Sequence, residues 1–315
     1  MEEQISCSAL PDTPWVANLD CLDGGSFVAS TALLHADSKA EDIRLYNWAF
    51  HVHDVKTDRH ILWDLGLSGD LSCYATSAAK VMEVVGVVGP GEPICQQLAR
   101  KGVLPHKIES VIFSHAHWDH CRPIKHEFPN AIPIFGPGTK DYCAPGHFQD
   151  QSSIWDGRFF DPEKQTENVE ELKGPWTRFG TFEKAMDFFG TGSFWVIQAP
   201  GHMPGNLAAA AKLTNGEWVV LASDCCHSRE LFDGTKKFAV WSGAKGTEES
   251  LHVDIPVALN TLDRLRMLES RLGAHIVLAH DTLWMLNEEN KTLQSIMDDK
   301  LKLAARTRIP LGECA

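Results

Sequence analysis

Residues 108–120 read Ile-Glu-Ser-Val-Ile-Phe-Ser-His-Ala-His-Trp-Asp-His, an apolar run that passes directly into a turn rich in histidine. The run 108–114 predicts a buried strand. A loop at the end of a rigid strand can aim several side chains into one cleft. Imidazole suits zinc and similar ions, and a carboxylate compensates their charge. The turn therefore supplies four candidate metal ligands: His115, His117, Asp119 and His120.

Three further candidates stand at the ends of other predicted strands. His202 follows the strand 193–199, Asp224 ends the strand 217–223, and His280 follows the strand 275–279. Each residue alone would be explained as a structural histidine or a surface aspartate. Because all three recur at the same kind of position as the first four, we expect seven ligands in one metal centre.

Hydrophobic periodicity predicts an α/β chain. Strands are expected at residues 26–34, 44–54, 60–65, 108–114, 131–135, 193–199, 206–213, 217–223 and 275–279. A broken helical pattern covers 76–102, and an amphipathic helix covers Pro256–Leu272, with Asp254 placed to cap it and Gly273 to end it. Strand-rich blocks followed by helix, repeated twice, indicate two sheets packed face to face with helices outside.

No composition break divides the chain, so residues 1–315 are interpreted as a single domain. The segment 140–190 is irregular and rich in Gly, Pro and aromatic residues. It is too long for a plain loop, and we expect it to be an insertion or lid over a site. Its aromatic side chains are expected mostly to pack its own core, with one or two lining the pocket. They are Trp155, Phe159, Phe160, Trp176, Phe179 and Phe182, with Phe188 and Phe189 beyond.

Composition excludes several classes of protein. The apolar fraction of 43% and the charged fraction of 23% are typical of globular proteins. No uninterrupted apolar run is long enough for a transmembrane helix, and the acidic start Met1–Gln4 lacks the pattern of a secretory signal, so a cytoplasmic protein without a membrane partner is expected. The net charge of -13 disfavours a nucleic-acid partner. Nine cysteines without a paired framework indicate reduced thiols.

The HxHxDH pattern of residues 115–120, the Gly-His pair at 201–202, Asp224 after a strand and the late His280 together resemble the metallo-β-lactamase superfamily. The resemblance extends from residue 25 to residue 285. It implies a four-layer αβ/βα sandwich with two metal ions at one sheet edge. The expected ions are two Zn²⁺, with Mn²⁺ or Fe²⁺ as alternatives.

The resemblance also divides the ligands between the two ions. By motif position, His115, His117 and His202 would bind the first metal. Asp119, His120 and His280 would bind the second, and Asp224 would bridge the two. Asp64 matches an early aspartate of the superfamily, and we expect it to orient one of the ligands from behind.

Segments 188–195, 199–202 and 278–281 look like the quorum-quenching N-acyl homoserine lactonase branch and its fungal relatives. This implies opening of a lactone by attack of a metal-bridging hydroxide, with Asp119 protonating the leaving group. That branch often places a tyrosine three residues after the bridging aspartate, where this chain has His227. The imidazole of His227 could donate a hydrogen bond to the substrate carbonyl or leaving group. The alternative interpretation is that His227 is a loop residue whose side chain faces solvent.

Other reactions stay open at this point. The substrate is expected to be a small acyl or lactone compound with a hydrophobic or aromatic part. Alternatives are the opening of a γ-lactam or cyclic carbamate, and cleavage of a thioester on a carrier protein or on glutathione. The basic residues that could bind glutathione are Lys300, Lys302, Arg306 and Arg308. A single-iron dioxygenase is the more distant alternative.

Overall fold

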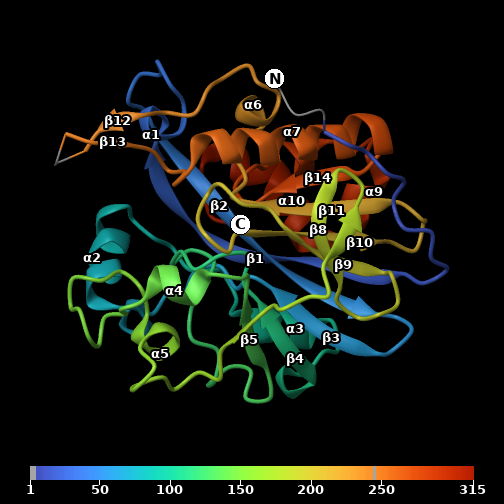
Figure 1. Cartoon of the computed structure of the whole chain (residues 1–315), viewed down its shortest axis with the longest axis horizontal. Helices are drawn as coiled ribbons and strands as arrows, with labels where there is room; N and C mark the ends of the chain where they lie inside the picture. Colours follow the sequence, from blue (N-terminus) through green and yellow to red (C-terminus); the bar gives the residue numbers. More distant parts are fainter. Residues whose placement is uncertain (1–4, 244–245) are drawn as a thin grey trace.

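The computed structural model describes residues 5–243 and 246–315, and two six-stranded mixed sheets form its centre (Figure 1). The first sheet has the order β1 (Ala17–Ser30), β2 (Asp42–Asp54), β3 (Arg59–Trp63), β4 (Ile108–Ile112), β5 (Ile132–Phe135), β6 (Glu170–Glu171). The second has the order β14 (His275–Leu278), β11 (Trp218–Ser223), β10 (Leu207–Lys212), β9 (Phe194–Gln198), β8 (Phe182–Asp187), β7 (Thr177–Phe179). A separate small hairpin joins β12 (Trp241–Ser242) to β13 (Glu248–Glu249).

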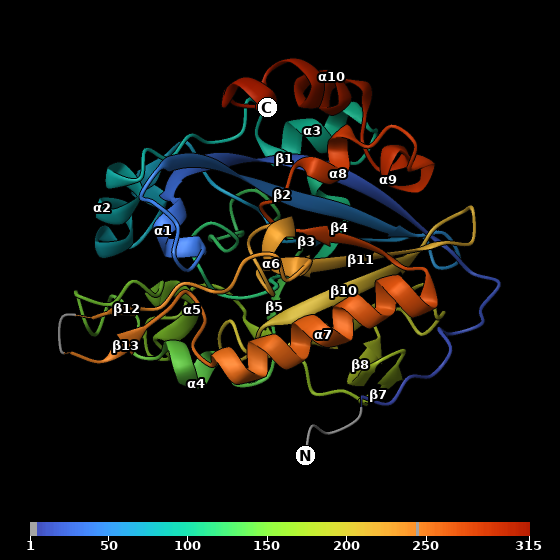
Figure 2. The same cartoon turned by 90° about the horizontal axis from the view of Figure 1, so that it is seen from above.

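The helices lie outside the sheets and at their ends. They are α1 (Thr31–Leu34), α2 (Thr76–Val84), α3 (Ile94–Arg100), α4 (Thr139–Cys143), α5 (Gly157–Phe160), α6 (Arg229–Phe232), α7 (Ile255–Leu272), α8 (Leu283–Leu286), α9 (Lys291–Ser295) and α10 (Asp299–Thr307). Figure 2 shows the layers: α3 on the far side of the first sheet, the two sheets facing each other, and α7 on the far side of the second. The predicted αβ/βα sandwich is therefore confirmed. None of the described helices is long and apolar enough to cross a membrane.

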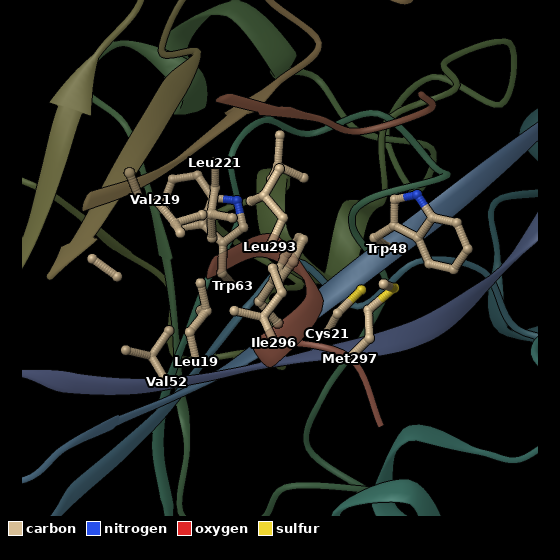
Figure 3. Packing of buried hydrophobic residues seen from close by; sticks show 14 of the residues in the cluster. Leu19, Cys21, Trp48, Val52, Trp63, Val219, Leu221, Leu293, Ile296 and Met297 are labelled. Carbon is tan, nitrogen blue, oxygen red and sulfur yellow. The ribbon is translucent and has the colours of Figure 1, made fainter. Parts of the chain in front are cut away.

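The space between the sheets is filled by alternate side chains of the strands. Figure 3 shows Val219 and Leu221 of β11 close to Trp63 of β3. The intervening residues Val220 and Ala222 point the other way, into the core beneath α7. Since β9, β10 and β11 bury both faces, their sequences are continuous apolar runs rather than alternating ones.

The C-terminal helices protect the free edge of the first sheet. The amide of Cys21 in β1 donates a hydrogen bond of 2.7 Å to the carbonyl of Ile296, just after α9. Side chains of α8, α9 and α10 then join the core between the sheets. Cover of this kind hinders pairing of this part of the edge strand β1 with another chain.

Two segments differ from the sequence-based prediction. The strand expected at 26–34 starts earlier and ends at Ser30, because residues 31–34 form the one-turn helix α1, closed by His35 N donating to the Thr31 carbonyl at 2.9 Å. Ala and Leu, which make up most of this turn, are good helix formers. The segment 140–190 is more regular than expected, since it contributes β7 and β8 to the second sheet and β6 to the first. That part of it acts as a lid stays a prediction.

Helix α7 has the predicted caps, and its first turn positions His202. The carboxylate of Asp254 accepts a hydrogen bond of 3.0 Å from Val257 N, and Gly273 ends the helix with φ 71°. The Asp254 amide donates to the Gly201 carbonyl at 3.0 Å. Gly201 has φ 125°, and a Cβ there would lie 2.4 Å from backbone atoms of Ala258. Only glycine therefore fits the position before His202.

The substitution Gly201→Ala is expected to lower the free energy of unfolding by about 2–4 kcal/mol, because it combines backbone strain with a clash against α7. Urea denaturation followed by circular dichroism measures the change. The matched control is Gly69→Ala, whose added Cβ would meet no atom within 4 Å. Equal stability of the two variants would show that the approach of α7 to this turn is not as tight as described.

Candidate metal centre

Asp64, which directly follows β3, organises the histidine-rich turn after β4. Its carboxylate accepts hydrogen bonds from Ser114 N at 2.7 Å, from Ser114 Oγ at 2.8 Å and from His120 Nδ1 at 2.9 Å. The residue is buried and holds φ 56°, a conformation that aspartate tolerates better than most residues. Because His120 donates from Nδ1, its lone pair lies on Nε2 and faces the site.

The ends of four strands meet at this turn. Strands β11 and β14 run parallel with Ser223 opposite Leu278, so their carboxyl ends bring Asp224 and His280 to the same edge. The amide of Leu207, at the start of β10, donates to the Ser114 carbonyl at 2.8 Å and joins the two sheets beside the site. The sheet edges thus bring together all seven residues predicted as metal ligands.

A first cluster consists of His115, His117, His202 and Asp224. His117 Nδ1 lies 2.9 Å from His115 Nε2 and 3.0 Å from His202 Nε2. Asp224 Oδ2 lies 3.8 Å from His115 Nε2 and 3.6 Å from His202 Nε2. Three imidazole nitrogens and one carboxylate oxygen therefore converge on one point.

A second cluster consists of Asp119, His120, Asp224 and His280. Asp224 Oδ1 lies 3.1 Å from His120 Nε2 and 3.2 Å from His280 Nε2. Asp119 Oδ2 lies 3.5 Å from each of these nitrogens. Asp224 therefore presents one oxygen to each cluster, which is the position of a bridging ligand.

The donor atoms fit a pair of metal ions. Ligands bound tetrahedrally about 2.0–2.1 Å from zinc lie about 3.3 Å from one another, which matches the spacing of both clusters. His120 Nε2 and Asp224 Oδ1 are buried 3.1 Å apart, but no hydrogen bond of good geometry joins them, an arrangement that is costly unless a cation satisfies both atoms. In His280, Nδ1 is 2.9 Å from the Tyr46 carbonyl, which leaves Nε2 free to face the site.

Burial and charge set the protonation of these groups. Burial lowers the pKa of His115 and of His202 well below the usual value, so both imidazoles are neutral and can act as ligands. Burial alone would also lower the pKa of His120, but the charge of Asp224 and its neighbours outweighs it and raises that pKa well above the usual value. Metal binding at the second cluster therefore competes with protonation of His120.

Of the two candidate catalytic residues, Asp119 belongs to the second cluster and His227 lies beside Asp224. Asn47 Nδ2 donates to the Asp119 carbonyl at 2.9 Å and to Asp119 Oδ2 at 3.2 Å, and so orients this carboxylate. His227 is only 6% exposed, and its Nε2 is 3.2 Å from Asp224 Oδ2. The alternative interpretation of His227 as a solvent-facing loop residue is therefore wrong.

A cavity of about 320 Å³ opens onto the clusters. Its polar wall includes His117, Asp119, His202, Asp224, His227 and His280. The rest of its wall is mainly apolar, with Phe27, Val28, Leu33, Leu34, Leu45, Trp118, Ile154 and Leu251. The site can therefore take a small ligand that combines a polar head with an apolar part.

The aromatic rings in this wall are not those that the sequence singled out. Phe27 and Trp118 meet edge to face at 5.1 Å, and neither had been considered as a substrate contact. From the segment 140–190 the wall receives Ile154, while Trp155 stacks on the His117 ring at 5.7 Å. The other aromatic residues named in and after this segment pack in or against the cores, as was expected for most of them.

His252 is a residue of the site that the sequence analysis missed. It is 4% exposed, and its ring lies 5.2 Å from that of His202 and 5.3 Å from that of His227. Burial lowers its pKa to about 3, so the ring is neutral. It stands just before α7 and not at the end of a strand, so no pattern in the sequence indicated that it would reach the metal centre.

Other side chains that the sequence raised are not part of the site. Burial raises the pKa of Cys225 to about 12, so its thiol is protonated and is no nucleophile. Lys300 pairs with Glu92 at 3.2 Å, and Arg306 pairs with Glu288 at 2.9 Å. Neither basic residue lines the cavity above the clusters.

Asp64→Asn is expected to weaken metal binding by about 10–100-fold, because an amide cannot replace all the hydrogen bonds that the carboxylate accepts from Ser114 and His120. Competition against a chromophoric chelator measures the affinity. The exposed Asp12→Asn serves as the control. Unchanged affinity in Asp64→Asn would contradict the orienting role of this carboxylate.

Comparison with known proteins gives relatives in sequence and in structure. No protein-family model matches the chain. It is 28% identical over 247 residues to a cytochrome P450 monooxygenase of Penicillium brevicompactum, covering 71% of this chain and 28% of that protein. It is 33% identical over 177 residues to a metallo-hydrolase of Annulohypoxylon moriforme, covering 54% of this chain and 45% of that protein. It is 30% identical over 160 residues to a γ-lactamase of Gibberella moniliformis, covering 46% of this chain and 63% of that protein.

The chain thus spans less than half the length of the monooxygenase and less than half the length of the metallo-hydrolase. Among solved structures, it resembles an N-acyl homoserine lactone hydrolase with N-hexanoyl-L-homoserine bound at the catalytic metal centre. The TM-score is 0.60 at 18% identity, and the match covers 88% of this chain and 96% of that one. At this level of identity the likeness establishes the fold.

Proposed function

We propose that this chain is a dinuclear metal-dependent hydrolase of the metallo-β-lactamase superfamily and that it opens a lactone with an apolar substituent. The observation that carries the proposal is the position of Asp224, whose two oxygens face two histidine clusters at the base of a mainly apolar cavity. Imidazole-rich clusters favour zinc, with Mn²⁺ or Fe²⁺ as alternatives.

The metals would be held by the seven residues of the two clusters. When bound, they would activate a water molecule near neutral pH and polarise the substrate carbonyl. The water oxygen bonds to the carbonyl carbon, the acyl C–O bond of the ring breaks, and the ring oxygen leaves as an alcohol. Asp119, which borders the cavity and is oriented by Asn47, transfers the proton from the water to that oxygen. His227, on the same wall, donates a hydrogen bond to the carbonyl oxygen as negative charge develops on it.

The cavity wall supports a neutral, partly apolar substrate. In the described part of the chain, the wall carries carboxylates and imidazoles but no Lys or Arg side chain that would select an anionic head group. Side chains of β1, α1 and Trp118 form the apolar side, where an acyl chain or a ring can be buried. The pairing of Lys300 and Arg306 with acidic residues, away from this wall, disfavours a glutathione thioester.

A second candidate function is the opening of a γ-lactam. It is favoured by the 30% identity to a fungal γ-lactamase. The same groups would serve, because a lactam differs only in its leaving atom. The nitrogen leaves less readily than oxygen and would depend more strongly on proton transfer through Asp119.

Metal-loaded protein is expected to release acid from lactones in a pH-stat, and faster from those with a longer apolar substituent. The panel includes benzo-fused lactams and acyl thioesters, with chelated protein as the blank. Asp119→Asn is expected to lose at least about 100-fold in kcat, because a proton-transfer group is removed. Turnover of lactams alone would replace the first candidate by the second, and turnover of thioesters alone would contradict both.

His227→Ala is expected to lower kcat/KM by about 100-fold or more at unchanged metal content, because a hydrogen-bond donor to the developing oxyanion is lost. His227→Gln, which keeps a donor, should recover part of this loss. The exposed His126→Ala is the control. If kcat/KM is unchanged in His227→Ala, the proposed donor role is wrong.

A further inference from the structure

Strands β2 and β3 lie side by side in Figure 1. The hairpin that joins them carries a second group of histidines, at the end of β3 opposite to Asp64. His53 and His60 face each other directly across the antiparallel pair. His51 lies two residues before His53 and therefore on the same face of the sheet. Asp58, in the turn itself, holds φ 56°, which directs the chain back toward β3.

Three of these side chains converge on one point. His53 Nε2 is 2.9 Å from Asp58 Oδ1, and His60 Nε2 is 3.8 Å from the same oxygen. One donor atom from each of the three residues lies within 4.8 Å of the others. The two imidazole rings are nearly parallel, with their centroids 4.2 Å apart. The three residues therefore offer one donor atom each for a single ion.

A hydrogen-bonded chain behind the group sets the tautomer of His60. Asp20 accepts from Lys101 Nζ at 2.9 Å and from His51 Nδ1 at 2.9 Å. In a neutral His51 ring, Nε2 is then the acceptor, and it lies 2.9 Å from His60 Nδ1, which donates to it. The lone pair of His60 is left on Nε2, which faces Asp58. Metal-binding histidines typically donate a hydrogen bond from their second ring nitrogen to a fixed acceptor, and His51, anchored by Asp20, is such an acceptor for His60.

His53 can also offer its Nε2 lone pair. Its other nitrogen, Nδ1, lies 3.3 Å from the side-chain amide of Asn18. That amide can present either its NH₂ group or its oxygen, so it accommodates both tautomers of the ring. The exposure of the group increases outward: the side chains of His60, His53 and Asp58 are 16%, 22% and 83% exposed. The histidines are thus held by their surroundings, and solvent reaches the group from the side of Asp58.

We propose that His53, Asp58 and His60 form a third metal site, which binds a divalent transition-metal ion such as Zn²⁺ independently of the two clusters beneath the cavity. Two imidazole nitrogens and one carboxylate oxygen form a protein ligand set known from zinc sites, and water fills the remaining positions. Mg²⁺ and Ca²⁺ are excluded as preferred ions because they favour oxygen ligands. The bound ion ties the turn to both strands of the hairpin.

The test is a calorimetric titration of Zn²⁺ into protein whose metal content has first been measured. Wild-type protein is expected to bind one equivalent beyond those of the cavity clusters. His60→Ala and His53→Ala should each weaken this binding at least tenfold. Asp58→Asn should also weaken it, while keeping the turn, because asparagine tolerates the same positive φ. Asp20→Asn is expected to weaken it about tenfold through His51.

The matched controls are His106→Ala and His126→Ala, which remove exposed imidazoles outside the group and should leave the titration unchanged. Circular dichroism of each metal-free variant verifies folding, and the exposed Asp58→Asn gives an answer even if a histidine variant fails to fold. The proposal is overturned if wild-type protein binds no further equivalent. It is also overturned if folded Asp58→Asn and His60→Ala bind this equivalent as tightly as wild type. The initial metal content reports on the cavity clusters separately.

Discussion

The buried carboxylate of Asp224 joins the two clusters of the metal centre, and the other ligands are arranged around it. Five imidazole nitrogens lie between 3.1 and 3.8 Å from its oxygens; they belong to His115, His120, His202, His227 and His280. Burial would raise the pKa of Asp224, but the charges of the surrounding histidines outweigh it and hold that pKa well below its usual value. An anion in this position is stable only with cations beside it, and the two clusters are arranged to hold them.

The sandwich supplies the rigidity that this arrangement needs. Asp224 follows Ser223, which has φ 47°, and the parallel strand β14 brings His280 to the same edge. The first sheet contributes the histidine-rich turn that follows β4. Asp64, which follows β3, holds this turn through its hydrogen bonds to Ser114 and His120. The ligands are therefore fixed by backbone pairing within two sheets. The apolar side of the cavity comes from a different place, the long strand β1 and the turn α1, so substrate preference can vary without disturbing the metal ligands.

Much of the fold and of the metal centre was predictable from the sequence, because both depend on strand ends and on neighbouring residues in the chain. Residues at the carboxyl ends of strands meet at a sheet edge, so His202, Asp224 and His280 could be placed together without knowledge of their distances. The caps of α7 were predictable because capping depends on adjacent residues. His252 was not predictable, because its approach to His202 depends on how the start of α7 packs against the second sheet. The aromatic side chains of the cavity wall were not predictable for the same reason, since the contact between Phe27 and Trp118, which are distant in the sequence, depends on tertiary packing.

The measurement that tests the central claim most directly is the metal content per chain of wild-type, His117→Ala and Asp224→Ala protein, after weakly held ions are removed on a chelating resin. We expect two ions in wild type, about one in His117→Ala because only the first cluster is damaged, and less than one in Asp224→Ala because both clusters lose their shared ligand. Retention of two ions by Asp224→Ala would show that this carboxylate does not bridge two metals. A single redox-active iron in wild type would contradict the proposed dinuclear centre, and would favour the dioxygenase alternative.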